Sequence, residues 1–277
     1  MIQDIYPKAF KNEYIHKSPT KNSIVICWSN DKILISDSKS AISYPEFSQF
    51  NRIKINFIFL FAIDEEDFFL ADFEEEITLD GFVYVSVNAL REAVPNHLAF
   101  AGITAHHLKV WYKDNQFCGR CKSNLTHSHS ERMLFCDKCN NMVYPQIAPV
   151  VIVALTNGDE ILLTQYANRQ YKKEALIAGF IEIGETPEEA VKREIMEEVG
   201  LKAKNITYFK SQPWGYSQSL LLGFFAQLDG ESKVKIDKQE LATAFWVNRE
   251  DLNTPEDELS LTYTMIKKFK DSFLFKN

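Results

Sequence analysis

The chain has 277 residues, of which 45% are hydrophobic and 25% are charged, a composition typical of a folded globular protein long enough for two domains. Its formal net charge of −7 argues against broad electrostatic binding to nucleic acid or membrane surfaces. The first residues carry no secretory signal pattern, and the longest apolar run, Phe57 to Ile63, is too short to cross a bilayer. We therefore expect a soluble, cytoplasmic protein without a membrane partner.

The first region, residues 1–113, has the pattern of a mixed α+β domain and carries no catalytic motif. A hairpin is indicated at Ser29-Asn30-Asp31, and the lone Cys27 in an apolar run is expected to be a buried small hydrophobe. The expected strands are 23–28, 32–36, 53–63, 68–73 and 82–87, and the expected helix is 98–112.

The second region, residues 114–143, contains two Cys-x2-Cys pairs separated by fourteen residues: Cys118, Cys121, Cys136 and Cys139. Four thiolates suit a tetrahedral zinc ion, and a site with four protein ligands has no open position for catalysis. We therefore expect a zinc ribbon with structural Zn²⁺; disulfides are the poorer alternative for a chain without an export signal. Nucleic-acid binding by the ribbon remains a rival function, although its charges are only weakly basic: Arg120, Lys122, Arg132 and Lys138 against Glu131 and Asp137.

In the third region, residues 144–277, strands and helices alternate. Asn157-Gly158 is a strong hairpin signal between the first two strands. The expected strands are 148–155, 160–165, 176–183, 206–210 and 220–228, and the expected helices are 187–199 and 259–273.

The helix at 187–199 has clear boundaries. Thr186 is a good N-cap, Pro187 occupies the first helical position, Glu189 completes a capping box, and Gly200 is a typical end. Three apolar residues recur every four positions and predict a buried stripe: Val191, Ile195 and Val199.

Three glutamates, Glu194, Glu197 and Glu198, fall at i, i+3 and i+4 of this helix and therefore share one face. Carboxylates this close repel one another unless a cation lies among them, and their hard oxygens suit Mg²⁺ or Mn²⁺. A solvated surface is the usual explanation of such a triplet when it stands alone.

Here the triplet belongs to a longer pattern that resembles the Nudix box, Gly-x5-Glu-x7-Arg-Glu-U-x-Glu-Glu-x-Gly-U with U aliphatic. Its seven fixed residue types would coincide by chance about once in 10⁸ windows: Gly179, Glu185, Arg193, Glu194, Glu197, Glu198 and Gly200. The resemblance implies an α/β/α sandwich that hydrolyses nucleoside diphosphates linked to another group. It further implies that Glu194, Glu197 and Glu198 bind the catalytic metal with the carbonyl of Ala178 and with Glu240, while Arg193 and Glu185 orient the cluster.

A second match follows the box. Ser211-Gln-Pro-Trp214 and Ser219 resemble the signature Ser-Gln-Pro-Trp-Pro-Phe-Pro-x-Ser of the zinc-ribbon NADH pyrophosphatases, but Gly215-Tyr216-Ser217 replaces Pro-Phe-Pro. The order of ribbon and catalytic domain is also similar to that subfamily, which implies a homodimer. The substrate contacts implied by the resemblance are Glu131, Tyr144, Phe180, Gln212, Pro213, Trp214, Gly215, Tyr216, Ser217, Gln218, Ser219 and, more weakly, Thr262.

The function implied is metal-dependent hydrolysis of the pyrophosphate bond of NAD(H), a dinucleotide substrate, to nicotinamide mononucleotide and AMP. The same chemistry on ADP-ribose, dinucleoside polyphosphates or NAD-capped RNA is the close alternative. A non-catalytic zinc-ribbon regulator that senses nucleotides is the distant one.

Overall fold

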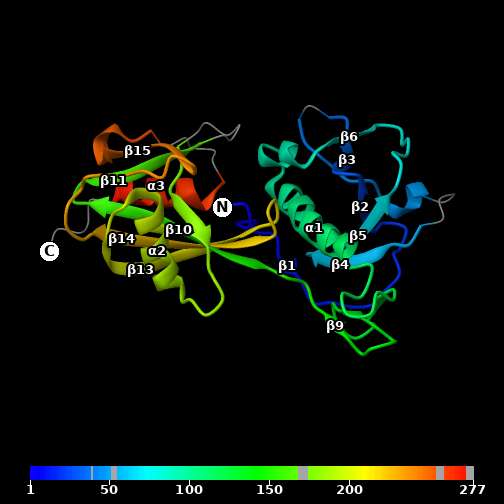
Figure 1. Ribbon diagram of the computed structural model, residues 1–277. Coiled ribbons are helices and arrows are strands. Elements are labelled where there is room, and N and C mark those ends of the chain that lie inside the picture. The colour runs from blue at the N-terminus through cyan, green and yellow to red at the C-terminus, as the bar shows by residue number, and fades with distance from the viewer. Residues whose placement is uncertain (39, 51–54, 168–173, 254–258, 273–277) are drawn as a thin grey trace. The chain divides into compact units, whose positions relative to one another are not determined.

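The computed structural model describes residues 1–38, 40–50, 55–167, 174–253 and 259–272 (Figure 1). The chain forms two compact units. The N-terminal unit comprises Ile2–Gln146 together with Gly215–Gln218, and the C-terminal unit comprises Met1, Ile147–Trp214 and Ser219–Asn277. The first region and the ribbon thus share one unit, to which a short turn from the second half of the chain also belongs.

The N-terminal unit is built on a six-stranded sheet of order β1-β4-β5-β2-β3-β6. The β2–β3 hairpin forms where expected, with Asn30 at φ 52° in the turn, and β2 and β5 are parallel. The strands are β1 (Phe10–Lys11), β2 (Ile24–Ser29), β3 (Lys32–Ser36), β4 (Ile58–Ile63), β5 (Glu66–Phe73) and β6 (Phe82–Ser86), with short helices η1 (Phe47–Phe50) and η2 (Val87–Arg91). The expected strand at 53–63 therefore begins only at Ile58; residues 53 and 54 lie outside the described residues.

One long helix, α1 (Asn96–Asp114), packs against this sheet and contacts β5 (Figure 1). It extends the expected helix at both ends. Cys27 is fully buried, as predicted, and burial raises the pKa of its thiol. After α1 the ribbon folds into a small antiparallel sheet: β7 (Thr126–His127), β8 (Leu134–Phe135) and β9 (Met142–Val143).

The C-terminal unit contains a sheet of order β13-β14-β10-β11-β15, in which β12 also pairs with β10. The central strand β10 is parallel to β14 and antiparallel to its other partners. The elements are β10 (Ala148–Asn157), β11 (Glu160–Tyr166), β12 (Ile177–Phe180), α2 (Pro187–Val199), β13 (Ala203–Trp214), β14 (Ser219–Leu228), β15 (Leu241–Asn248), η3 (Arg249–Asp251) and α3 (Leu261–Asp271). Of these, β15 was not expected from the sequence.

Alternating side chains of β10 enter two separate cores, one on each face of the sheet. Val151, Val153 and Leu155 pack in the core that α2 covers, together with Val191, Ile195 and Val199 of that helix. Val150, Ile152 and Ala154 pack in the core that α3 covers, with Leu261, Met265, Ile266 and Phe269. A helix on each face of one sheet confirms the α/β/α sandwich. Among the described residues, no helix is long and apolar enough to span a membrane.

Candidate active site and metal centre

Helix α2 begins and ends as its sequence predicts. The Thr186 side chain accepts a hydrogen bond from the Glu189 N–H at 3.3 Å, and the Glu189 carboxylate accepts one from the Thr186 N–H at 2.8 Å. Gly200 adopts φ 67°, and its N–H donates to the Met196 carbonyl at 3.0 Å. The capping box and the glycine fix the ends of the helix, while the buried Val191, Ile195 and Val199 fix which of its faces meets the sheet.

Arg193 is the centre of the hydrogen-bond network at this helix. Its Nε and Nη2 each donate to one oxygen of the Glu185 carboxylate, both at 2.8 Å. Nη2 also donates to the Phe180 carbonyl at 2.8 Å. Nη1 donates to the Glu194 carboxylate at 2.6 Å and to the Glu197 carboxylate at 3.0 Å. The Arg193 hydrogen bonds, followed by the Glu182 N–H, lower the pKa of Glu185 to about 2. Arg193 thereby ties the preceding loop to the acidic face of α2.

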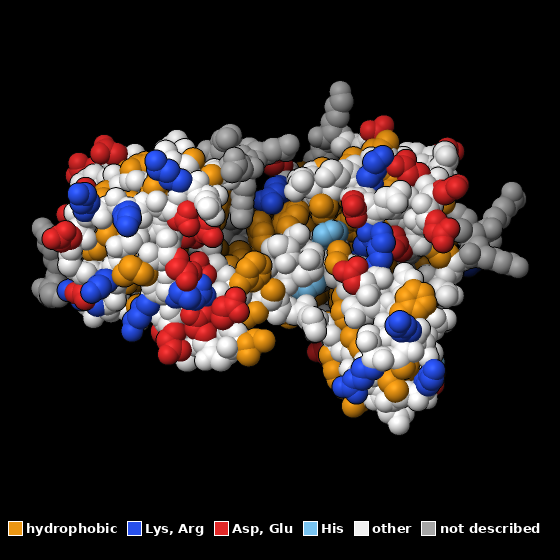
Figure 2. Space-filling view, in the orientation of Figure 1, with side chains coloured by type: hydrophobic (Ala, Val, Ile, Leu, Met, Phe, Trp, Pro, Cys, Tyr) orange, Lys and Arg blue, Asp and Glu red, His pale blue; other side chains and the backbone are white. Residues whose placement is uncertain are grey.

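The three glutamates of this face differ in burial. Glu194 and Glu198 are buried, whereas the Glu197 side chain is more than half exposed. Burial is the main cause that raises the pKa of Glu194; Arg193 opposes it, and the negative charges of Glu197 and Glu240 add to it. Figure 2 shows acidic side chains gathered over α2 and the loop before it, with basic side chains among them.

Gly179 on β12 allows a close approach between the strand and the Glu194 carboxylate. A Cβ at this position would lie 1.9 Å from Glu194 Cδ and Oε1, far inside any van der Waals contact. The neighbouring Ala178 pairs with Ile152 of β10, so the backbone that precedes Gly179 is held by the central strand. Only a glycine lets this carboxylate lie against the strand.

This donor set fits a divalent cation. Two buried carboxylates, an exposed one and the nearby Glu240 concentrate negative charge at one face, and the charges of Glu197 and Glu240 add to burial, the main cause, in raising the pKa of Glu194. A hard cation would relieve that repulsion, and carboxylate and carbonyl oxygens are the ligands that Mg²⁺ and Mn²⁺ prefer. The residues that could hold such an ion are Glu194, Glu197, Glu198 and Glu240, and their role as metal ligands stays a prediction.

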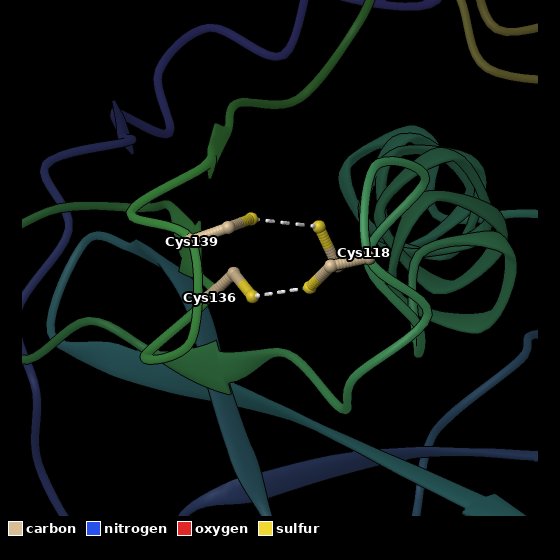
Figure 3. A group of neighbouring side chains, drawn as sticks. Cys118, Cys136 and Cys139 are labelled. Atoms are coloured by element: carbon tan, nitrogen blue, oxygen red, sulfur yellow. Dashed lines mark hydrogen bonds between the residues drawn. The ribbon is translucent and has the colours of Figure 1, made fainter.

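The four cysteines of the ribbon come together in two matching knuckles. In the first, the Lys122 N–H donates to the Cys118 carbonyl at 2.8 Å, and in the second the Asn140 N–H donates to the Cys136 carbonyl at 2.9 Å. Lys122 and Asn140, each directly after the second cysteine of its pair, adopt left-handed φ values of 62° and 57°. The two turns thus present their thiols in the same way, facing each other across the site (Figure 3).

The sulfur geometry suits zinc, and all four cysteines are free of disulfides. The Cys118 and Cys139 sulfurs are 3.6 Å apart, and those of Cys121 and Cys136 are 3.4 Å apart. All four sulfurs lie within 4.8 Å of one another. A tetrahedral zinc ion with Zn–S bonds of 2.3 Å would separate its sulfurs by about 3.8 Å, whereas a disulfide needs about 2.05 Å. The site can therefore hold one Zn²⁺ with four ligands.

The expected substrate contacts outside the loop after β13 lie in both units. In the C-terminal unit, Phe180 at the end of β12 is 55% exposed, and Thr262 is half-buried in α3. In the N-terminal unit, Tyr144 is exposed and close to Glu131: partial burial, followed by the Glu131 charge and hydrogen bond, raises the pKa of Tyr144. The structure thus brings Tyr144 and Glu131 together on the ribbon.

Among the expected contacts at residues 212–219, Gln212 lies near the end of strand β13 and is fully buried. Its Nε2 donates to the Leu259 carbonyl at 2.9 Å, and its Oε1 accepts from the Leu261 N–H at 2.6 Å, at the start of α3. Both ends of the amide are therefore occupied within the fold, and a direct contact with substrate stays a prediction. Ser219 is also buried, and Pro213 is exposed.

The turn between β13 and β14, Gly215–Gln218, belongs to the N-terminal unit. There the Gly215 carbonyl lies 2.9 Å from Nδ1 of His106 on α1, a residue that the sequence analysis did not single out. His106 and the adjacent His107 belong to no motif, so only the three-dimensional contact distinguishes His106.

Comparisons with known proteins find relatives of the C-terminal part of the chain. The family model described as NUDIX domain matches residues 146–269. The NAD-capped RNA hydrolase NudC of Klebsiella pneumoniae subsp. pneumoniae is 44% identical over 146 residues, which are 52% of this chain and 56% of that protein. The protein of the same description from Escherichia coli O1:K1 / APEC is 42% identical over 145 residues, with the same two shares. The chain thus spans about half the length of these curated relatives.

Among solved structures, a NUDIX hydrolase from Nitrosomonas europaea aligns with a TM-score of 0.46 at 17% identity. The alignment covers 57% of this chain and 92% of that one.

Proposed function

Because the NUDIX domain model matches residues 146–269, we propose that this chain is a Nudix hydrolase and that it hydrolyses the pyrophosphate bond of NAD(H) to nicotinamide mononucleotide and AMP. The observation that carries the proposal is the acidic face of α2. There Arg193 holds Glu185, Glu194 and Glu197 in one network beside the buried Glu198. The name of the relatives, NAD-capped RNA hydrolase, supports an NAD-containing substrate.

In this proposal Glu194, Glu197, Glu198 and Glu240 hold Mg²⁺ or Mn²⁺, together with the Ala178 carbonyl. A bound divalent ion supplies neutralisation of the phosphate charge and a water molecule of lowered pKa. Arg193 and Glu185 keep the glutamates in place, and Glu197 or Glu198 takes the proton of the attacking water. The exposed ring of Phe180 offers a face on which a nucleobase can stack.

The four cysteines stabilise the ribbon by binding Zn²⁺, and Glu131 and Tyr144 on the ribbon are candidate substrate contacts. We further propose that the enzyme is cytoplasmic and homodimeric. NAD-capped RNA is the second candidate substrate, because it carries the same dinucleotide and because the relatives' description names it.

A hydrolysis panel tests the proposal. The purified full-length protein is incubated with NADH, NAD, ADP-ribose, diadenosine polyphosphates or NAD-capped RNA, with Mg²⁺ and with Mn²⁺, and kcat/KM is measured for each. We expect the highest kcat/KM for an NAD-containing substrate and no turnover in chelator. If ADP-ribose or a dinucleoside polyphosphate exceeded every NAD-containing substrate, the assignment to NAD(H) would be wrong.

A further inference from the structure

The turn Gly215–Gln218 is held tightly within the N-terminal unit. A Cβ on Gly215 would lie 2.3 Å from the Ile103 carbonyl oxygen and 3.0 Å from the Ile103 side chain. The backbone of the turn therefore lies directly on helix α1, at a distance that only glycine allows. Gln218 closes the turn with a left-handed φ of 53°.

His106, nearly one turn of α1 after Ile103, makes a directed contact with the same residue. Its Nδ1 is 2.9 Å from the Gly215 carbonyl oxygen, and the ring is buried. A carbonyl oxygen only accepts, so Nδ1 carries the proton and donates it. Burial lowers the pKa of His106, which favours the neutral ring, while the Gly215 hydrogen bond opposes this shift.

A third contact holds the aromatic residue of the turn. The Arg91 guanidinium carbon lies 4.3 Å from the centroid of the Tyr216 ring, a cation–π distance. Arg91 is the last residue of η2, so it is carried by an element that contacts α1. Backbone and side chain of the turn are thus bound separately.

These contacts explain how the turn can be ordered without the prolines that the resembling signature contains. Proline restricts the backbone before any contact forms, whereas Gly215-Tyr216-Ser217 has no such restriction and loses more conformational entropy when it is ordered. Contacts from α1 and η2 must supply that order here. Ile103, His106 and Arg91 together form what we call the loop seat.

We propose that the loop seat fixes the turn Gly215–Gln218 in the conformation that binds the nucleotide, so that His106 and Arg91 are positioning residues for substrate affinity. This inference rests on the proposed function, since it takes NAD(H) as the ligand of the loop. It assigns to the N-terminal unit a part in substrate recognition.

Three substitutions of His106 test the directed hydrogen bond. The amide nitrogen of asparagine can take the place of Nδ1, that of glutamine takes the place of Nε2, and alanine offers neither. We expect His106→Gln and His106→Ala to raise KM for NADH about tenfold with kcat within about twofold, and His106→Asn to stay within about threefold of wild type in both. A purely structural role predicts the opposite order, because asparagine is a poorer helix former than glutamine. KM values that are equal in the Asn and Gln variants, or lower for Gln, would overturn the proposal.

Hydrogen exchange of the full-length protein without substrate gives a second readout. We expect the amides of residues 215–218 to be protected in wild type and in His106→Asn, and to exchange at least about tenfold faster in His106→Gln, with the remaining protected amides of α1 unchanged. Unprotected amides at 215–218 in wild type would overturn the loop seat whatever the substrate. Absence of NADH hydrolysis by the wild type would instead refute the proposed substrate, and exchange would still decide whether the seat exists.

Discussion

Gly179→Ala is the sharpest test of the acidic site, because the structure fixes what the added methyl group meets. The new Cβ would lie 1.9 Å from the Glu194 carboxylate, and ordinary contact begins at about 3.4 Å, so the carboxylate must move by about 1.5 Å, the difference between the two. Gly179 does not have a positive φ, so alanine causes no backbone strain there. The substitution therefore displaces one proposed metal ligand and leaves the strand intact.

A misplacement of about 1 Å at a reacting centre costs on the order of 10²-fold in rate, equivalent to about 2.7 kcal/mol of activation free energy. We expect kcat for NADH to fall by at least about 10²-fold. The concentration of Mg²⁺ or Mn²⁺ needed for half-maximal activity should rise. The unfolding temperature should change by no more than a few degrees. The assay is steady-state hydrolysis over a range of metal concentrations, with thermal unfolding of the same preparations.

Gly158→Ala is the matched control. Gly158 has φ 62° in the β10–β11 turn and nothing within 4 Å of an added Cβ, so alanine there strains the backbone without touching the site. We expect this variant to lose about 1 kcal/mol of stability and to keep the wild-type kcat. If Gly179→Ala kept the wild-type kcat, or lost activity only in proportion to its folded fraction, the proposed position of Glu194 would be refuted.

Four further predictions follow from the same structure. Glu197→Gln and Glu198→Gln should each lower kcat by at least about 10²-fold with little change in unfolding temperature; wild-type turnover in both would exclude them as metal ligands or base. Protein purified without chelator should contain one zinc per chain by elemental analysis, and Cys136→Ser should unfold at a lower temperature; zinc-free protein of unchanged stability would argue against the ribbon site. Gln212→Ala should cost about 1–3 kcal/mol in denaturant unfolding for each of the two buried backbone groups that it leaves unpaired, and an unchanged midpoint would contradict this. The pKa of Glu185 is about 2 in the folded protein against an ordinary value of 4.5. Its ion pair with Arg193 therefore contributes fully to folding stability above about pH 4.5, and this contribution is lost as the pH falls through about 2. The difference in unfolding temperature between wild type and Glu185→Gln should therefore narrow over that range, and a constant difference would show that Arg193 does not hold this carboxylate.

Most of the sandwich was predictable because its signals are local. Thr186, Glu189 and Gly200 mark the ends of α2 by capping rules that act within one turn, and Asn157-Gly158 marks the β10–β11 hairpin in the same way. The strand β15 escaped prediction because its residues Leu241–Asn248 alternate poorly: only Leu241 is fully buried, and the strand lies at the edge of the sheet. Its pairing with β11 is decided by hydrogen bonds to a strand about 80 residues earlier, which no local pattern encodes.

In the candidate site, too, the features with local signals were predictable and the long-range contacts were not. The spacing of Glu194, Glu197 and Glu198 placed them on one helix face, and the Cys-x2-Cys spacing placed the four thiols together, because each signal spans less than two helical turns or one tight turn. The hydrogen bond from Arg193 to the Phe180 carbonyl and the loop seat at His106 join residues 13 and 109 positions apart. Such contacts depend on the path of the whole chain, so composition and periodicity carry no trace of them.

The two cores on either side of β10 also set the order in which this unit can become stable during synthesis. The side of the strand with Val150, Ile152 and Ala154 is covered by α3, whose residues 261–271 follow it by more than a hundred positions. Until that helix has left the ribosome, the sheet presents an uncovered apolar face, and such a face favours association with other chains. A chain that stops before Leu261 should therefore aggregate even though its acidic helix and all the carboxylates proposed to bind metal are present.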